Sequence, residues 1–233
     1  MSPPKLYFVV TTSIQTNEGE KNALKRQEQY IRGISSLVEA TQQQLPLEHQ
    51  IVVVENNGHR RTFLDDLDDV TVLYTTNNKK KQFVRRRWWL PDSRIPSKGT
   101  KELWDILACI DHFDMQPHDL VVKMTGRYYL DNHDDTKPPG NFLQALHHLR
   151  WTETQAIVKF GSYMKPLNTT NVVDCITGLI MMPVHAIRRI QPRDIIEHAW
   201  AQEALALPPS TVIPVQGPMG IHIAPGGVEY YLV

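Results

Sequence analysis

Short apolar runs that alternate with helical hydrophobic patterns constrain the fold of this chain more than any other feature. The runs at 6–10, 51–54 and 70–74 are rich in branched and aromatic residues and are closed by polar turn residues, as buried strands are. Apolar side chains recur at helical spacing between the first two runs, over residues 24–38. This order predicts an α/β fold with a mostly parallel sheet and helices on both of its faces.

The remainder of the chain continues the pattern less regularly. An amphipathic helix is predicted to begin at Gly99, and a fourth strand at 119–124. Further strands are expected at 156–160 and 176–182, and a helix at 193–206. The sequence contains no internal repeat and no low-complexity linker. We therefore expect one domain over residues 1–233, with a nucleotide-binding half (about 5–130) and an acceptor-binding half (about 131–233).

Composition limits the classes of protein that remain. Hydrophobic residues make up 41% of the 233 residues, which is enough to bury a core, and 25 basic residues balance 25 acidic ones. No overall field therefore draws the chain to nucleic acid or to an anionic membrane. Two cysteines exclude a disulfide framework and a cysteine-rich zinc site. Without a long apolar stretch or a signal-like start, we expect a cytoplasmic protein with no transmembrane segment.

Ligands of open α/β sheets bind outside the carboxyl ends of the strands. The residues that follow each predicted strand are therefore candidate ligand-binding residues. These segments are polar at 11–13, 55–57, 75–78 and 125–127. Such groups suit the base and ribose of a nucleotide, with a carboxylate that accepts the ribose hydroxyls. Polar loops also follow strands in proteins with no ligand there, and this alternative stays open.

Two basic segments suggest an anion site. Lys98 and Gly99 precede the strongest predicted helix, whose N-terminus carries partial positive charge. Lys123 and Arg127 flank a small Thr-Gly turn at a strand end, where they suit a phosphate or diphosphate, although Arg127 also suits a structural carboxylate. The glycine motifs of dinucleotide-binding proteins and P-loop enzymes and the serine elbow of α/β-hydrolases are absent.

These segments, in this order, carry a family resemblance. Thr-Thr-Ser, Glu-Asn-Asn, Ser-Lys-Gly-Thr-Lys-Glu and Val-Val-Lys-Met-Thr-Gly-Arg-Tyr resemble small GT-A-type glycosyltransferases, above all glycosyltransferase-like proteins with a Lys-x-Thr-Gly-Arg-Tyr string. The resemblance spans roughly residues 5–224. It implies a GT-A-like, Rossmann-type sheet whose first half binds a nucleotide-sugar donor and whose second half binds a glycan or another hydroxyl acceptor.

The resemblance also implies donor-side roles. Thr11, Thr12 and Glu55 would face the base and ribose, and Lys98 would lie near the donor. His222, in a Gly-Ile-His-Ile string, suits contact with the diphosphate but equally suits a plain strand position.

Metal dependence is open because the sequence departs from the family pattern. Many GT-A enzymes carry an Asp-x-Asp metal motif where this chain has Lys123 to Arg127. One alternative is that Asp131 and the pair Asp134–Asp135 hold a divalent cation, Mn or Mg, with the donor diphosphate. The other is that Lys123 and Arg127 replace the metal and stabilise the leaving nucleoside diphosphate.

An inverting transferase needs a carboxylate that deprotonates the acceptor hydroxyl. Asp174 precedes a glycine-containing strand that resembles the one before the acceptor site in this fold, and Glu197 lies at a predicted helix start. Glu203 is a third candidate. For each of these carboxylates a solvated surface position is the alternative.

The sequence thus predicts a nucleotide-sugar-dependent hexosyl- or pentosyltransferase of glycan biosynthesis. One alternative is a nucleotidyltransferase acting on a sugar phosphate. Another is a noncatalytic module that binds nucleic acid or glycan through the basic, aromatic run at 79–89. Because a local run in a neutral chain is usually a solvated loop, we expect no nucleic-acid partner.

Overall fold

The computed structural model describes residues 4–15, 22–45, 48–80, 82–87, 90–94, 96–131, 141–149, 153–161, 174–192, 195–223 and 231–233. For residues 82–87 and 90–94 it describes the course of the backbone.

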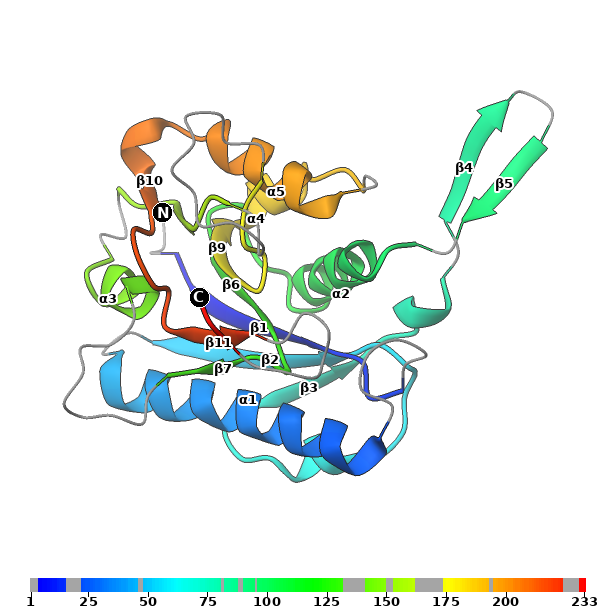
Figure 1. Cartoon of the computed structure of the whole chain (residues 1–233), viewed down its shortest axis with the longest axis horizontal. Helices are drawn as coiled ribbons and strands as arrows, with labels where there is room; N and C mark the ends of the chain where they lie inside the picture. The colour runs from blue at the N-terminus through cyan, green and yellow to red at the C-terminus, as the bar shows by residue number, and fades with distance from the viewer. Residues whose placement is uncertain are drawn as a thin grey trace.

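A seven-stranded sheet forms the centre of the molecule (Figure 1), with the strand order β10-β8-β9-β6-β1-β2-β3. Its strands are β1 (Leu6–Thr12), β2 (His49–Glu55), β3 (Thr71–Tyr74), β6 (Leu120–Thr125), β8 (Ala156–Val158), β9 (Leu179–Pro183) and β10 (Val212–Pro214). Strands β1, β2, β3 and β6 are mutually parallel, and β10 is parallel to β8. Strand β9 runs antiparallel to both of its neighbours. The predicted α/β fold with a mostly parallel sheet is confirmed.

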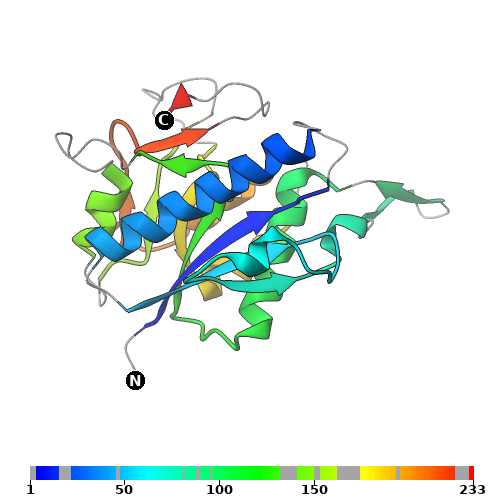
Figure 2. The ribbon, with the colours of Figure 1, turned by 90° about the horizontal axis from the view of Figure 1, so that it is seen from below.

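Helices cover both faces of this sheet, as predicted (Figures 1 and 2). The helices are α1 (Ala23–Gln44), α2 (Lys98–His112), α3 (Asn141–His147), α4 (Val184–Ile187) and α5 (Ile196–Leu205), with short 3-10 helices η1 (Phe63–Asp66), η2 (Asn77–Lys79) and η3 (Pro209–Thr211). Among the helices that the structure describes, none combines the length and the apolar character needed to cross a bilayer.

The side chains of strand β1 explain why helices pack on both faces of the sheet. Phe8 and Val10 belong to a core shared with α1 and α3, whereas Tyr7 and Val9 belong to a second core shared with α2, α4 and α5. Successive side chains of a strand point to opposite faces. A strand that is apolar at five successive positions, as β1 is over residues 6–10, therefore requires two apolar layers, which these helices supply.

Two smaller sheets are separate from the seven-stranded sheet. Strands β7 (Tyr129–Leu130), β11 (Ile221–Ile223) and β12 (Tyr231–Leu232) form an antiparallel sheet beside α1. Strands β4 (Gln82–Arg87) and β5 (Leu90–Arg94) form a hairpin that projects from the body of the molecule (Figure 1). The sequence pattern predicted neither sheet. Strands β7, β11 and β12 have too few residues to show a period, and the segments of β4 and β5 are rich in basic and polar residues.

Helix caps fix where the helices beside the strand ends begin. The Asn22 side chain accepts hydrogen bonds from the backbone N–H groups of Leu24 (3.1 Å) and Lys25 (3.2 Å), and α1 starts there. Ser97 accepts from the N–H of Thr100 (3.2 Å) and caps α2. Such caps satisfy donors that the helix itself leaves free. The cap of α2 makes Lys98 its first helical residue.

A close backbone approach seats α1 against the segment that follows β6. A Cβ atom placed on Gly33 would lie 2.2 Å from the carbonyl oxygen of Gly126 and 2.5 Å from that of Tyr128. Gly126 is itself confined, because its own Cβ would meet the Thr12 side chain at 2.9 Å. Only a residue without a side chain fits at these two contacts.

We expect Gly33→Ala to destabilise the fold by roughly 1–3 kcal/mol or more, because backbone carbonyls cannot yield to the added methyl as a flexible side chain would. Urea denaturation measures the loss. Ser35→Ala, at an exposed position of the same helix, is the matched control. Equal stability of Gly33→Ala and the control would contradict the close contact.

Candidate functional site

The polar strand ends predicted from the sequence lie at one edge of the sheet. In the strand register Thr12 is opposite Glu55, and Glu55 is opposite Tyr74. On the other side of β1, Thr11 is opposite Thr125. The N-terminus of α2 reaches the same edge, since Glu102 in its second turn contacts Lys123 and Thr125 of β6. This edge is the candidate site.

A buried ion pair lies at its centre. The Lys123 ammonium group is 2.7 Å from Glu102 Oε2, and Lys123 is 2% exposed. The same Nζ atom donates to the Thr125 hydroxyl (2.9 Å) and to the backbone carbonyl of Thr177. These three partners use all three donors of a lysine. Lys123 therefore contributes positive charge to the site while its hydrogen bonds hold β6, α2 and the start of β9 together.

Further cations surround this pair. Lys98 Nζ lies 3.7 Å from Glu102 Oε1, and 46% of the Lys98 side-chain surface is exposed. Desolvation lowers the pKa of Lys98 to about 8. The positive charges of Arg127, Lys123 and Arg26 also lower this pKa, whereas the negative charge of Glu102 raises it. We call Lys98, Lys123, Arg127 and Arg26 the cationic cluster.

Glu102 remains ionised within the cationic cluster. Burial, the largest single effect, raises the pKa of its carboxyl group, but Lys123 and Lys98 outweigh it and bring the pKa down to about 2. Sequence reasoning missed this residue. Its signal was present, because Lys98 and Glu102 are four residues apart on a helix, the spacing at which opposite charges meet.

Arg26 is a second residue that the sequence analysis missed. It lies in the first turn of α1, and its guanidinium donates to the backbone carbonyl of Ser13 (Nε, 2.8 Å) and to the Tyr30 hydroxyl (3.1 Å). It is 4% exposed, as is Arg127, and the two guanidinium groups repel each other. A charged residue near a helix start normally indicates a solvated turn, so nothing in the sequence marked Arg26 as buried.

Glu55, the predicted ribose acceptor, is fully buried and hydrogen-bonded within the protein. Its carboxylate accepts from the Thr12 hydroxyl (2.8 Å), the N–H of Ile14 (3.0 Å) and the Asn57 side chain (2.5 Å), with Arg60 at 3.6 Å. These bonds order the loop after β1. The structure thus joins Thr12 and Glu55 in one network. The proposed contacts of Thr11, Thr12 and Glu55 with base and ribose stay predictions.

A third missed residue, Asp105 of α2, ties together the loops after β2 and β3. Its fully buried carboxyl group accepts from Asn56 Nδ2 (2.8 Å), Thr75 Oγ1 (2.9 Å) and Asn77 Nδ2 (2.8 Å). Desolvation raises the pKa of Asp105 to about 7, although the hydrogen bonds from these three donors lower it. One side chain thereby sets the shape of two of the four predicted strand-end loops.

Two predicted base candidates, Asp174 and Glu197, lie in chain segments whose neighbouring residues contact Lys123 and the start of α2. Asp174 precedes Cys175, whose thiol donates to the backbone carbonyl of Glu197 (3.4 Å), and Cys175 is two residues before Thr177, the acceptor of Lys123. Desolvation raises the pKa of Asp174. The catalytic roles of Asp174 and Glu197 stay predictions.

Helix α5, which carries Glu197, packs directly on the start of α2. A Cβ on Gly99 would lie 2.1 Å from Cγ2 of Ile196, so the helices meet at the residue next to Lys98. Glu203, the third candidate base, instead forms an ion pair with Arg189 (2.8 Å).

His222 and Asp131 meet each other on the small sheet. His222 Nε2 is 3.5 Å from Asp131 Oδ1, and its ring stacks on Tyr129 at 4.5 Å between centroids. The Arg32 guanidinium lies 3.3 Å from the centre of the Tyr129 ring. The proposed contact of His222 with a diphosphate stays a prediction.

The predicted metal ligands lie only in part within the residues that the structure describes. Within the described ranges, no group of three or more histidine, cysteine, aspartate or glutamate side chains is placed to hold a metal ion. Asp131 has a histidine beside it, and its proposed companions Asp134 and Asp135 lie outside the described residues. Both alternatives for the diphosphate, a bound divalent cation and the cations of the cluster, stay predictions.

The architecture is a mostly parallel, Rossmann-type α/β sheet flanked by helices, and the candidate site lies at the carboxyl edge of that sheet. No family model matches the sequence, and no curated protein sequence matches it. A solved structure of 4-diphosphocytidyl-2C-methyl-D-erythritol synthase is similar over 93% of this chain and 91% of that chain, with a TM-score of 0.45 and 11% identity. A glycosyltransferase involved in the glycosylation of the major capsid of PBCV-1 is similar over 79% of this chain and 62% of that chain, with a TM-score of 0.35 and 9% identity. These likenesses concern the course of the chain alone.

The charge of Glu102 should make the stability of the fold depend on pH. Its pKa of about 2 in the folded state lies below the ordinary value of 4.5, so its stabilisation is present above pH 4.5 and is lost as the pH falls toward 2. The difference corresponds to on the order of 3 kcal/mol. We expect Glu102→Gln to lose about this much at pH 7 and to show a flatter pH dependence below pH 4.5, both measured by urea denaturation.

The exposed Glu28 provides the matched control, because Glu28→Gln removes the same charge from a solvated face of α1. A Glu102→Gln variant as stable at pH 7 as Glu28→Gln would contradict the structural role of the ion pair.

Proposed function

We propose that this protein is a nucleotide-sugar-dependent glycosyltransferase that transfers a sugar to an acceptor hydroxyl on a glycan. The observation that carries the proposal is the cationic cluster at the carboxyl edge of the sheet. Four cationic side chains of the described residues gather there near the carboxylates of Glu102 and Glu55, and Arg60 also contacts Glu55. Fixed cations at a strand end suit an anionic ligand. The diphosphate of a nucleotide-sugar is such a ligand.

The cluster lies where this class of sheet binds ligands. The strand-end loops after β1, β2 and β3 adjoin it on one side, and they carry amide and hydroxyl groups suited to a base and ribose. The N-terminus of α2 adds partial positive charge beside Lys98. We therefore assign the donor diphosphate to the cluster and the nucleoside to the loops.

The residues of the cluster have different tasks in this proposal. Lys98 is exposed enough to contact a phosphate directly, whereas Arg127 is 4% exposed and acts through its charge. Lys123 acts mainly by its charge and by placing Glu102, because its donors are already used. As the bond from sugar to diphosphate breaks, negative charge grows on the leaving group, and these fixed cations stabilise it.

The acceptor hydroxyl would lose its proton to a carboxylate of the second half of the chain. Glu197 follows Ile196, which packs on Gly99 at the start of α2, and Asp174 precedes Cys175, whose thiol donates to the Glu197 carbonyl. Desolvation raises the pKa of Asp174, which makes its carboxylate a better proton acceptor than an ordinary aspartate.

Nucleoside diphosphates and their sugar conjugates should raise the melting temperature. A ligand at about 100 times its dissociation constant adds roughly 2.7 kcal/mol of stability. A panel of these ligands, each with and without manganese, identifies the donor class and tests whether a divalent cation takes part. No shift with any nucleotide under either condition would overturn the proposal.

We expect Arg127→Ala to reduce the rate of transfer by about ten- to a thousandfold, the range for removing a fixed charge from a transition state. Arg127→Lys, which keeps the positive charge, should recover part of the rate. Thermal unfolding without ligand verifies that both variants fold. Full activity in a folded Arg127→Ala protein would remove this residue from the mechanism.

The products separate the proposal from its nearest rival. A glycosyltransferase releases a nucleoside diphosphate from a nucleotide-sugar, whereas a nucleotidyltransferase joins a nucleoside triphosphate to a sugar phosphate and releases diphosphate. Both reactions fit a cationic cluster, so the assay must supply both substrate pairs and identify the phosphorylated product.

A further inference from the structure

A chain of hydrogen bonds crosses the carboxyl edge of the sheet from helix α2 to strand β2. Lys101 Nζ donates to Asn78 Oδ1 (2.8 Å), and Asn78 Nδ2 donates to Asn57 Oδ1 (2.7 Å). Asn57 Nδ2 donates in turn to the buried carboxylate of Glu55 (2.5 Å). We call Lys101, Asn78 and Asn57 the rim network. It ties the first turns of α2 to the loops after β2 and β3.

The charged groups at its two ends fix the orientation of both amides. An ammonium group only donates, so the oxygen of Asn78 faces Lys101. A carboxylate only accepts, so the nitrogen of Asn57 faces Glu55. The second N–H of each amide is directed to the loop after β1, at 3.3 Å in both cases. The two amides therefore have no donor left for a ligand.

The ammonium group of Lys101 does have donors left. Among the described residues Asn78 is its one hydrogen-bond partner, and a lysine has three N–H donors. The side chain is half-buried, so its other two N–H groups remain within reach of a ligand. The rim network thus presents a positively charged hydrogen-bond donor that is held in place by Asn78.

The carboxylates beside the rim network are already occupied. Glu55 and Asp105 are fully buried, and each accepts hydrogen bonds from three or more donors of the protein. Neither presents an exposed oxygen to the amino group of a ligand. A ligand that reaches this part of the edge therefore meets the Lys101 donor. Such a position favours a carbonyl oxygen over an amino group.

Lys98 and Lys101 leave the start of α2 in different directions. Lys98 turns to Glu102, which contacts Lys123 of β6, whereas Lys101 turns to Asn78, which follows β3. Strands β1 and β2 lie between β6 and β3 in the sheet. A donor with its diphosphate on the cationic cluster and its nucleoside on the loops extends from the β6 side to the β3 side. The edge of the base farthest from the ribose then meets Lys101.

We propose that Lys101 selects a donor whose base carries a carbonyl oxygen at the edge far from the ribose, which means uracil or guanine. This inference rests on the proposed function and names the base of its donor. Cytosine and adenine carry an amino group at the same edge, and that group would turn a donor toward the ammonium. A site built to hydrogen-bond one group rejects the analogue that lacks it.

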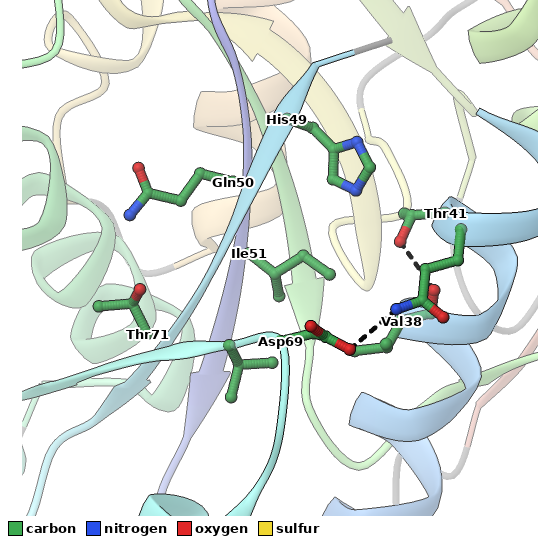
Figure 3. A pocket seen from close by; sticks show the side chains of 9 residues that line it. Val38, Thr41, His49, Gln50, Ile51, Asp69 and Thr71 are labelled. Carbon is green, nitrogen blue, oxygen red and sulfur yellow. Dashed lines mark hydrogen bonds between the residues drawn. The ribbon is translucent and has the colours of Figure 1, made fainter. Parts of the chain in front are cut away.

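The opposite edge of the sheet has a cavity of different chemistry (Figure 3). Its volume is about 460 Å³, and it lies between the last turns of α1 and the starts of β2 and β3. No lysine or arginine lines it, and the Asp69 carboxylate there accepts from Gln42 Nδ-type amide nitrogen Nε2 (2.9 Å). Without a cation this cavity does not suit a diphosphate, so we place the donor at the carboxyl edge.

The test compares nucleotides of equal ring size by isothermal titration calorimetry. Within each pair, uridine diphosphate against cytidine diphosphate and guanosine diphosphate against adenosine diphosphate, the nucleotide with the carbonyl oxygen should bind tighter. We expect a factor of roughly ten to a hundred, the range for a hydrogen bond to a charged group. Lys101→Met, which keeps the apolar stem and removes the ammonium, should bring both members of a pair to equal affinity. Lys101→Arg should preserve the preference.

Lys5→Met is the matched control, because Lys5 is an exposed lysine directly before β1, at the other edge of the sheet. Thermal unfolding without nucleotide verifies that the variants fold. Equal binding within both pairs by the wild-type protein would overturn the role of Lys101 and leave the proposed function standing. Equal weakening of all four nucleotides by Lys101→Met would place the lysine on a phosphate and would also overturn it. Failure of every nucleotide to bind would overturn the proposed function together with this inference.

Discussion

The buried pair of Lys123 and Glu102 is the interaction on which the geometry of the candidate site depends. It joins the central strand β6 to helix α2, and the bond from Lys123 to the Thr177 carbonyl extends the junction to the second half of the chain. A lysine buried without such partners would lose its charge or unfold its surroundings. Because the pair is satisfied on every side, the cations around it are held in place before any ligand arrives.

Three further residues, Asp105, Glu55 and Gly33, organise the same edge of the sheet. Asp105 gathers the loops after β2 and β3, and Glu55 orders the loop after β1. Gly33 lets α1 approach the segment after β6 so closely that Arg26 reaches the loop after β1. Packing, buried carboxylates and helix ends thus act together, and they hold the four cationic side chains where the parallel strands end.

Most of the fold could be predicted because the buried strands are long apolar runs and the main helices are strongly periodic. The antiparallel direction of β9 could not, since the apolar run of a buried strand has the same pattern in either direction. Strands β7, β11 and β12 are too short to show a period. The candidate site was found in part. Lys98, Lys123 and Arg127 followed from their place near strand and helix ends, whereas Arg26 and Asp105 resemble ordinary charged residues of surface helices until the tertiary contacts are known.

The sequence by itself determined the class of sheet, the positions of its polar ends and the local excess of positive charge at residues 79–94. These properties follow from the order of residue types along the chain. Only the tertiary structure decided which charges meet. It showed that the ammonium group of Lys123 donates its hydrogen bonds to other groups of the protein. It also showed that Asp131 lies beside His222 on the small sheet. The physical reason is that electrostatic energies depend on distance and burial, and residues far apart in sequence acquire both only when the chain folds.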